Sequence, residues 1–163
     1  MNKQRIAVVP GSFDPMTNGH ISIVKRATEL YDTVYVAVMI NDKKQYMFTL
    51  EQRESIARAC LDGMTNVKVI SSRDWLWHLC MELDACAIVK GYRNETDLKY
   101  ENEMALFNKE HYPKAETILL KADNSMTDLS STLIRDKILN GQCLDEYLPQ
   151  KAVEVIKSIK PKI

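Results

Sequence analysis

The sequence predicts an α/β fold in which a parallel five-stranded sheet is covered by helices on both faces. Short apolar runs alternate along the chain with longer segments of helical periodicity. The apolar runs are nearly continuous, which is typical of parallel strands buried on both faces. The length of 163 residues suits one domain, so we expect a single unit over residues 1–163.

The expected strands are the short runs rich in β-branched and other apolar residues. The first, Ile6-Ala7-Val8-Val9, leads directly into the turn residues Pro10 and Gly11. Four similar runs follow, separated by segments with helical spacing. Together the five expected strands cover residues 6–9, 34–39, 67–70, 87–89 and 117–120.

The segments between these runs repeat apolar residues with the spacing of a helix. Thr49 and Gln52 have capping-box spacing, which predicts a helix start at Thr49. Gly141 suits the position just after a helix end, and Pro149 suits the first position of the last helix. The expected helices cover residues 19–31, 50–63, 74–83, 96–111, 131–140 and 150–159.

The chain carries 22 basic and 22 acidic residues, so its formal net charge is zero. This balance argues against a nucleic-acid partner, which favours a basic surface. No apolar run approaches the roughly 20 residues that span a bilayer, and the first residues lack the apolar segment of a secretory signal. We therefore expect a cytoplasmic protein that binds neither nucleic acid nor membrane.

The four cysteines, Cys60, Cys80, Cys86 and Cys143, form no Cys-x-x-Cys pair and show no zinc-ligand spacing with histidine. In a reducing compartment such residues are expected as buried thiols. The sequence therefore predicts no metal site built from protein ligands.

The segment Pro10-Gly11-Ser12-Phe13-Asp14-Pro15-Met16-Thr17-Asn18-Gly19-His20 joins the first expected strand to the first helix. Gly11 lets the backbone approach a ligand closely, and Ser12 offers a hydroxyl. Gly19 and His20 fall in the first helical turn, where free N–H groups and the helix dipole attract anions. Residue by residue, the segment is also an ordinary loop. The combination of these groups favours a phosphate site.

This string resembles the signature of the nucleotidyltransferase superfamily, Gly-(Ser/Thr)-Phe-Asp-Pro followed by a motif ending in Gly-His. Most relatives have histidine at both ends of the second motif, whereas this chain has Thr17 at the first. The Thr-Asn-Gly-His form is similar to that of the bacterial phosphopantetheine adenylyltransferases. The resemblance covers essentially the whole chain. It implies a Rossmann-like fold, ATP and 4′-phosphopantetheine as substrates, and assembly into a homohexamer.

Lys43 and Lys44 follow the second expected strand. Two lysines in a loop are most often solvated charge, but ligands of parallel α/β sheets bind beyond the carboxyl ends of the strands. The string resembles the family's Lys-x-x-Met-Phe-Thr-Leu-Glu-x-Arg segment, with Lys44 and residues 47–53 matching. The resemblance implies that Lys44 binds phosphate between the two substrates, and it assigns no role to Lys43.

The segment Lys90-Gly91-Tyr92-Arg93 follows the fourth expected strand and resembles the family's (Arg/Lys)-Gly-Leu-Arg motif. Tyr92 replaces the usual leucine. Lys90 keeps the charge of the frequent arginine without its bidentate fork. From the residues alone, the favoured interpretation is a basic turn before a helix capped at Thr96.

Ser130, Ser131 and Thr132 open the expected helix 131–140. Hydroxyl residues at a helix start commonly cap it, and together with free N–H groups they also form an anion site. The string resembles the superfamily's Ile-Ser-Ser-Thr-x-(Ile/Val)-Arg motif, with Leu129 in place of isoleucine. Residues 126–128 lack the aromatic side chains that many related enzymes carry there.

The resemblance implies that His20 donates to the α-phosphate in the transition state, that Ser12 orients the incoming phosphate, and that Lys44 draws the two anions together. Arg93, with the helix start at 130–132, is expected to hold the β- and γ-phosphates. The expected catalytic residues are therefore His20, Ser12, Lys44 and Arg93. Because the attacking phosphate is already largely deprotonated, with a second pKa of roughly 6, in-line attack needs neither a strong base nor a covalent intermediate.

The family match also implies the binding residues. Leu76 is expected at the pantetheine arm and Lys90 among the residues that bind the acceptor substrate, while Mg²⁺ accompanies ATP through phosphate oxygens and water. Expected nucleotide contacts are Ser12, Phe13, His20, Gly91, Tyr92, Arg93, Glu101, Met126, Thr127, Asp128, Leu129, Ser130, Ser131 and Thr132.

Two other functions fit parts of the sequence. An enzyme of the same superfamily acting on nicotinate mononucleotide or glycerol 3-phosphate would share most motifs. Thr17 and the absence of an acceptor-recognition insert argue against it. A non-catalytic nucleotide- or coenzyme A-binding protein would not need the intact set of Ser12, His20, Lys44 and Arg93.

Overall fold

The computed structural model of the protein describes residues 2–159, so residue 1 and residues 160–163 of the expected single unit lie outside the described range. Strands and helices alternate along the described chain, as the sequence predicts. The strands are β1 (Ile6–Gly11), β2 (Thr33–Met39), β3 (Val67–Ser72), β4 (Ala87–Tyr92) and β5 (Glu116–Lys121). The helices are α1 (Asn18–Leu30), α2 (Leu50–Cys60), α3 (Leu76–Glu82), α4 (Glu95–His111), the short 3₁₀ helix η1 (Asn124–Met126), α5 (Ser131–Leu139) and α6 (Gln150–Ser158).

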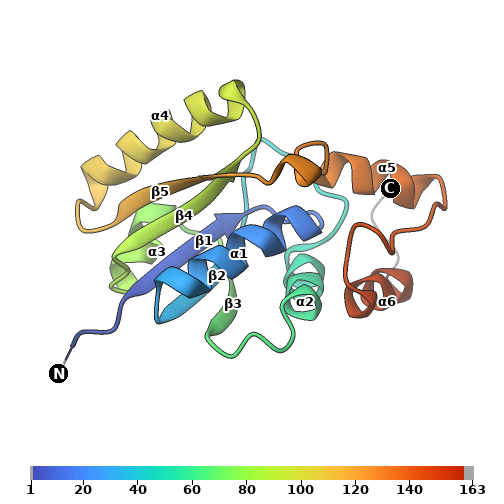
Figure 1. The fold of residues 1–163 in the computed structure, drawn as a ribbon, viewed down its shortest axis with the longest axis horizontal. Coiled ribbons are helices and arrows are strands. Elements are labelled where there is room, and N and C mark those ends of the chain that lie inside the picture. The colour runs from blue at the N-terminus through green and yellow to red at the C-terminus, as the bar shows by residue number, and fades with distance from the viewer. Residues whose placement is uncertain (1, 160–163) are drawn as a thin grey trace.

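All five strands are parallel and lie in the order β3-β2-β1-β4-β5 (Figure 1). The strand order reverses between β1 and β4, because the chain runs outward from β1 to β3 and then returns to β4. β1 pairs with β2 along its whole length but with β4 only at Ala7 and Val8. The two central strands therefore separate toward their carboxyl ends, at the place where α/β sheets bind ligands.

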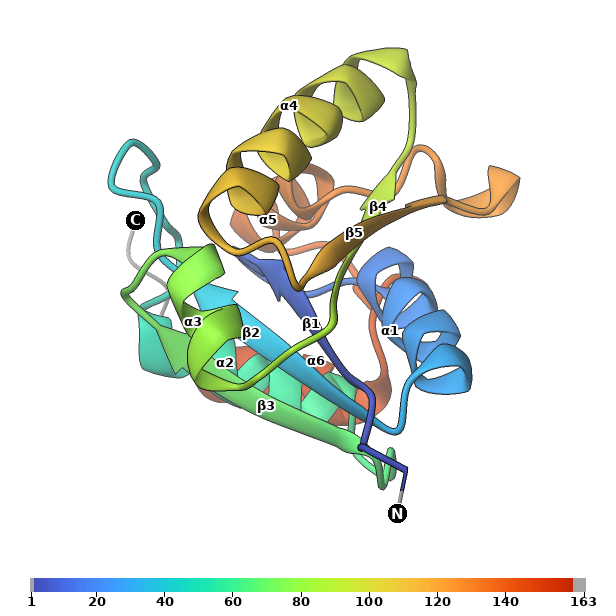
Figure 2. The ribbon, with the colours of Figure 1, turned by 90° about the vertical axis from the view of Figure 1, so that its left-hand side faces the viewer.

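Helices cover both faces of the sheet, as predicted (Figure 2). Residues of α1, α2, α5 and α6 share one apolar core with Val34, Val36 and Val38 of β2. On the other face, Leu79 and Cys80 of α3 belong to a second core with residues of β1, β2 and β4. α4 packs against α3, β4 and β5. None of the helices within residues 2–159 has the length and apolar character needed to cross a membrane.

Two of the expected helix signals are confirmed. The Thr49 hydroxyl accepts from the Gln52 backbone N–H (3.1 Å), and the Gln52 side chain accepts from the Thr49 N–H (2.9 Å). These contacts complete the capping box of α2. Gly141 follows the end of α5 with a φ of 62°, in the left-handed region that favours glycine.

Two expected helix starts are wrong by one or two residues. α4 is capped by Asn94, whose side chain accepts from the Asp97 N–H (2.8 Å), and not by Thr96. An asparagine two residues earlier already supplies the oxygen that the free N–H groups need. Pro149 is the residue before α6 and not its first residue.

The cysteines divide into two classes. Cys60 and Cys80 are buried as expected, and burial raises the pKa of each thiol to about 12. Cys86 and Cys143 are exposed, which corrects the expectation of buried thiols. Cys86 precedes β4 at the rim of the sheet, and Cys143 lies in the segment between α5 and α6, where no core covers it.

Candidate active site

A cleft of about 750 Å³ opens where the carboxyl ends of β1 and β4 separate. Its walls come from the loops after β1, β2, β4 and β5, with further residues from the starts of α3, α4 and α5. This volume lies within the usual range of small-molecule sites, roughly 300–1,000 Å³. The expected site residues that line the cleft are Ser12, Phe13, His20, Lys44, Leu76, Lys90, Gly91, Tyr92, Arg93, Glu101, Met126, Leu129, Ser130, Ser131 and Thr132.

The loop after β1 is shaped by close packing between Gly11 and Phe13. A Cβ at Gly11 would lie 2.7 Å from Cζ of the Phe13 ring, so only glycine fits there. Phe13 has a φ of 48°, in the left-handed region, and is almost completely buried. Its ring meets the His20 imidazole edge to face, with centroids 5.1 Å apart. Phe13 therefore packs against His20 in the wall of the cleft.

His20 occupies the first turn of α1 with a defined hydrogen-bond partner. The Thr17 backbone N–H donates to its Nδ1 (3.0 Å), so the neutral imidazole carries its proton on Nε2. Burial, with a smaller contribution from the Arg93 guanidinium, lowers the pKa of His20 from 6.5 to about 4. His20 is thus a neutral N–H donor at physiological pH.

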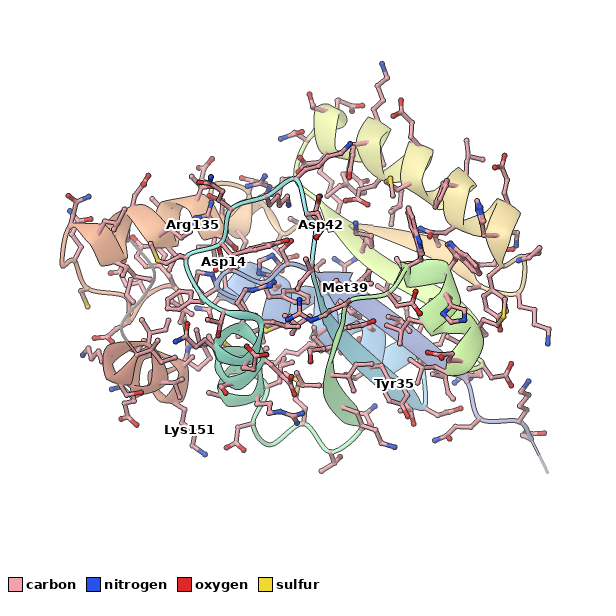
Figure 3. All side chains as sticks on the ribbon, turned by 180° about the vertical axis from the view of Figure 1, so that it is seen from behind. Asp14, Tyr35, Met39, Asp42, Arg135 and Lys151 are labelled. Carbon is pink, nitrogen blue, oxygen red and sulfur yellow. The ribbon has the colours of Figure 1, made fainter. Side chains whose placement is uncertain are left out.

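Asp14 joins three segments around the cleft. Its carboxylate accepts from the backbone N–H groups of Met47 (2.9 Å) and Phe48 (3.0 Å), just before α2. Arg135 of α5 donates to the Asp14 carbonyl (2.9 Å) and lies 3.8 Å from its carboxylate (Figure 3). The β1–α1 loop, the Lys44 loop and α5 are therefore held together through one buried residue.

Lys44 lies in an exposed turn between β2 and α2. Its backbone N–H donates to the Asn41 carbonyl (2.9 Å). Its side chain lines the cleft and forms no ion pair within residues 2–159, so its charge is available to an anion. Lys43, the adjacent lysine, is exposed and is not among the residues that line the cleft. Of the two lysines, only Lys44 is therefore placed to bind a ligand in the cleft.

The end of β4 and the loop that follows it supply two cations, each paired with a carboxylate of α4. Lys90 Nζ lies 2.7 Å from Glu101, and Arg93 Nε lies 3.2 Å from Asp97. Lys90 and Glu101 are mostly buried, whereas Arg93 is more exposed. Arg93 can exchange its carboxylate for a phosphate at low cost, because exposed ion pairs contribute little free energy.

The hydroxyls at the start of α5 all have partners. Ser130 caps the helix by accepting from the Leu133 N–H (3.1 Å), as one of the three was expected to do. The Ser131 hydroxyl donates to the Pro15 carbonyl (2.8 Å), and the Thr132 hydroxyl accepts from Arg135 (3.0 Å). These contacts seat the helix start against the β1–α1 loop.

Thr127 and Asp128 are not among the residues that line the cleft. The Thr127 hydroxyl donates to the Asn124 carbonyl (3.1 Å), which closes the turn at η1, and Asp128 is exposed. Their contact with a nucleotide stays a prediction that this arrangement does not support.

Four residues that shape the site were missing from the expected set. Asp14 and Arg135 stand inside the motifs quoted above, so the signal was present but no role was attached to it. Arg53 is the last residue of the family segment that begins at Lys44, and it is buried beneath the cleft. Tyr46 stands at a position that the family segment leaves unspecified. Their importance depends on contacts across more than thirty residues, which local spacing does not reveal.

Comparison with known proteins identifies the family of the chain. Residues 8–137 match the model of the cytidylyltransferase-like family. The chain is 38% identical over 153 residues to the phosphopantetheine adenylyltransferase of Lactobacillus helveticus, covering 93% of each protein. It is also 38% identical to the enzymes of that name from Streptococcus gordonii, with 94% of each chain covered, and Clostridium tetani, with 93% of this chain and 94% of the relative covered.

Among solved structures, the fold matches that of a candidate nicotinate-nucleotide adenylyltransferase from Vibrio parahaemolyticus, with a TM-score of 0.72. The alignment covers 96% of this chain and 93% of that one at 17% identity, which shows a shared fold. The sequence identities above extend over nearly the whole chain. The protein therefore belongs to the cytidylyltransferase-like nucleotidyltransferases and, within them, to the phosphopantetheine adenylyltransferase family.

Proposed function

We propose that the protein transfers the adenylyl group of ATP to 4′-phosphopantetheine, giving dephospho-coenzyme A and pyrophosphate. The observation that supports this most strongly is the meeting of His20, Lys44 and Arg93 in one cleft. These residues are far apart in the sequence: His20 lies in the first turn of α1, Lys44 follows β2 and Arg93 follows β4. A neutral N–H donor and two cations around one space suit two phosphate-bearing substrates better than a single nucleotide.

The proposed reaction is an in-line attack of the phosphopantetheine phosphate on the α-phosphorus of ATP. The attacking oxygen forms the new P–O bond as the bond to pyrophosphate breaks. No residue needs to remove a proton, since a phosphate monoester with a second pKa of roughly 6 is already largely dianionic at neutral pH. The enzyme's contribution is positioning and stabilisation of charge.

The geometry suggests a role for each group. His20 donates its Nε2 proton in a hydrogen bond to an α-phosphate oxygen, because its Nδ1 is occupied by the Thr17 N–H. Lys44, which has no ion pair within residues 2–159, lies between the two anions and reduces their repulsion. Arg93 leaves Asp97 to bind the β- and γ-phosphates, together with the N–H groups at the start of α5.

We further propose that Mg²⁺ enters with ATP, held by phosphate oxygens and water. The carboxylates that line the cleft are engaged by Met47, Phe48, Lys90 and Arg93, which leaves no protein cage for the ion among the described residues. When bound, the ion would supply charge neutralisation on the pyrophosphate leaving group. Outside the cleft, Asp74, His78 and Glu82 have ligand atoms within 4.8 Å of one another, but Asp74 and His78 already pair and nothing there indicates a bound ion.

Pyrophosphate release tests the proposed activity directly. The enzyme is mixed with MgATP and, in separate reactions, 4′-phosphopantetheine, nicotinate mononucleotide or glycerol 3-phosphate. We expect release with phosphopantetheine alone. Release with another acceptor would identify a different transferase, and binding of ATP without release in any reaction would identify a non-catalytic protein.

We also propose assembly into a homohexamer in the cytoplasm. Trp75 and Leu106 are 64% and 68% exposed, which is unusual for large apolar side chains and fits burial between subunits. Light scattering after gel filtration should give six times the chain mass of 18.7 kDa. The free cysteines, two of them exposed, fit a reducing compartment.

A further inference from the structure

Arg53 connects two walls of the cleft from below. It lies on α2 and is almost completely buried. One guanidinium nitrogen donates to the Ser12 carbonyl (2.6 Å) and to the Met39 carbonyl (2.9 Å), which ties the β1–α1 loop to the end of β2. The guanidinium carbon also lies 3.9 Å from the centre of the Tyr46 ring. One buried cation therefore fixes both the Ser12 backbone and the Tyr46 ring.

The Tyr46 hydroxyl closes the turn that carries Lys44. It accepts from the Asn41 N–H (2.7 Å) and donates to the Asn41 carbonyl (3.3 Å). The same carbonyl accepts from the Lys44 N–H (2.9 Å). The Tyr46 hydroxyl thus joins the two ends of the exposed turn 41–46, and the Tyr46 ring packs against Arg53.

The same hydroxyl reaches Ser12. Tyr46 Oη lies 3.4 Å from Ser12 Oγ, and either atom could be the donor. A phenol has one proton and two acceptor sites, so two arrangements are available. If Tyr46 donates to Asn41, the Ser12 proton points at Tyr46. If Tyr46 donates to Ser12, the Ser12 proton is free for a phosphate oxygen, and the Asn41 carbonyl keeps its bond from Lys44.

We propose that Tyr46 is a positioning residue for adenylyl transfer, an inference that rests on the proposed function. With substrate bound, its hydroxyl donates to Ser12 Oγ and turns the serine proton toward the phosphate. It also holds the turn from which Lys44 reaches the cleft. Each hydroxyl keeps its own proton, so the arrangement orients groups without moving a proton between them.

Tyr46→Phe tests this role, because phenylalanine keeps the ring on Arg53 and removes only the hydroxyl. Pyrophosphate release is measured with MgATP and 4′-phosphopantetheine for wild type, Tyr46→Phe, Ser12→Ala and the double variant. The matched control is Tyr35→Phe, which removes a hydroxyl outside the cleft (Figure 3). Thermal unfolding of each variant shows that the compared proteins are folded.

For Tyr46→Phe we expect kcat/KM for phosphopantetheine to fall about three- to tenfold, the range of one neutral hydrogen bond, with the KM for ATP changing less than about twofold. In the Ser12→Ala background the same change should have a smaller effect than in wild type, because the serine partner is absent and only the contacts of the hydroxyl with Asn41 are lost. Tyr35→Phe should match wild type.

Two results would overturn the inference while leaving the proposed function intact. One is wild-type kcat/KM in Tyr46→Phe. The other is a Tyr46→Phe effect that multiplies fully with that of Ser12→Ala, which would mean that the hydroxyl does not act through the serine. If the wild type itself releases no pyrophosphate, the proposed function fails and the role of Tyr46 fails with it.

Discussion

Lowering the pH from 7 to 5 should leave His20 mostly neutral, whereas the same change protonates an ordinary histidine almost completely. With the pKa near the value of about 4 that burial and Arg93 impose, roughly one-tenth of His20 is protonated at pH 5. A histidine with the ordinary value of 6.5 would be about 97% protonated there. The neutral state is what leaves the Nε2 proton directed at a phosphate while Nδ1 accepts from Thr17.

This difference has a consequence for stability whose sign follows from linkage. Because the pKa of His20 is lower in the folded protein, the unfolded chain binds more protons between pH 6.5 and pH 4. Stability is therefore greatest above pH 6.5 and declines as the pH falls toward 4. At pH 5 the loss due to His20 comes to about 2 kcal/mol.

Two measurements check the prediction. An NMR titration of the His20 ring should give a pKa well below 6.5. Urea unfolding of wild type and His20→Gln at pH 7 and pH 5 should show that wild type loses about 2 kcal/mol more over this interval, since every other group is common to both proteins and cancels. A His20 titration near 6.5, or equal losses in the two proteins, would refute the reasoning.

Three substitutions test the site further. His20→Ala should lower kcat by about 10²–10³ and leave ATP affinity within about a few-fold, because a transition-state donor is lost; unchanged turnover would remove His20 from the reaction. Lys44→Ala should slow turnover and raise the KM for phosphopantetheine, whereas Lys43→Ala, outside the cleft, should not; equal effects would contradict the assignment. Gly11→Ala places a carbon 2.7 Å from the buried Phe13 ring and should destabilise the fold by about 1–3 kcal/mol in urea unfolding; a wild-type midpoint would disprove this packing.

Much of the fold could be predicted from the sequence because its signals are local. The continuous apolar runs form the strands, and the capping box at Thr49 begins α2. Ser130 caps α5 as one hydroxyl of its group was expected to. The order of the strands and the separation of β1 from β4 are set by packing between distant segments. They therefore could not be predicted from the spacing of residues along the chain.

The candidate site shows the same division. The loops at the carboxyl ends of the strands carry the expected polar residues, and the cleft brings His20, Lys44 and Arg93 together. The residues that hold these loops in place could not be predicted. Arg53 reads as one more charge on an amphipathic helix, and only the folded chain shows that it is buried under Ser12 and Tyr46.

The central claim is that His20 and Lys44 act on the same phosphates, and a crystal structure with dephospho-coenzyme A bound measures this directly. The account predicts that one phosphoryl oxygen of the bridging diphosphate lies about 3 Å from His20 Nε2 and another lies at similar distance from Lys44 Nζ. A diphosphate bound against only one of these groups, or outside the cleft, would contradict the account.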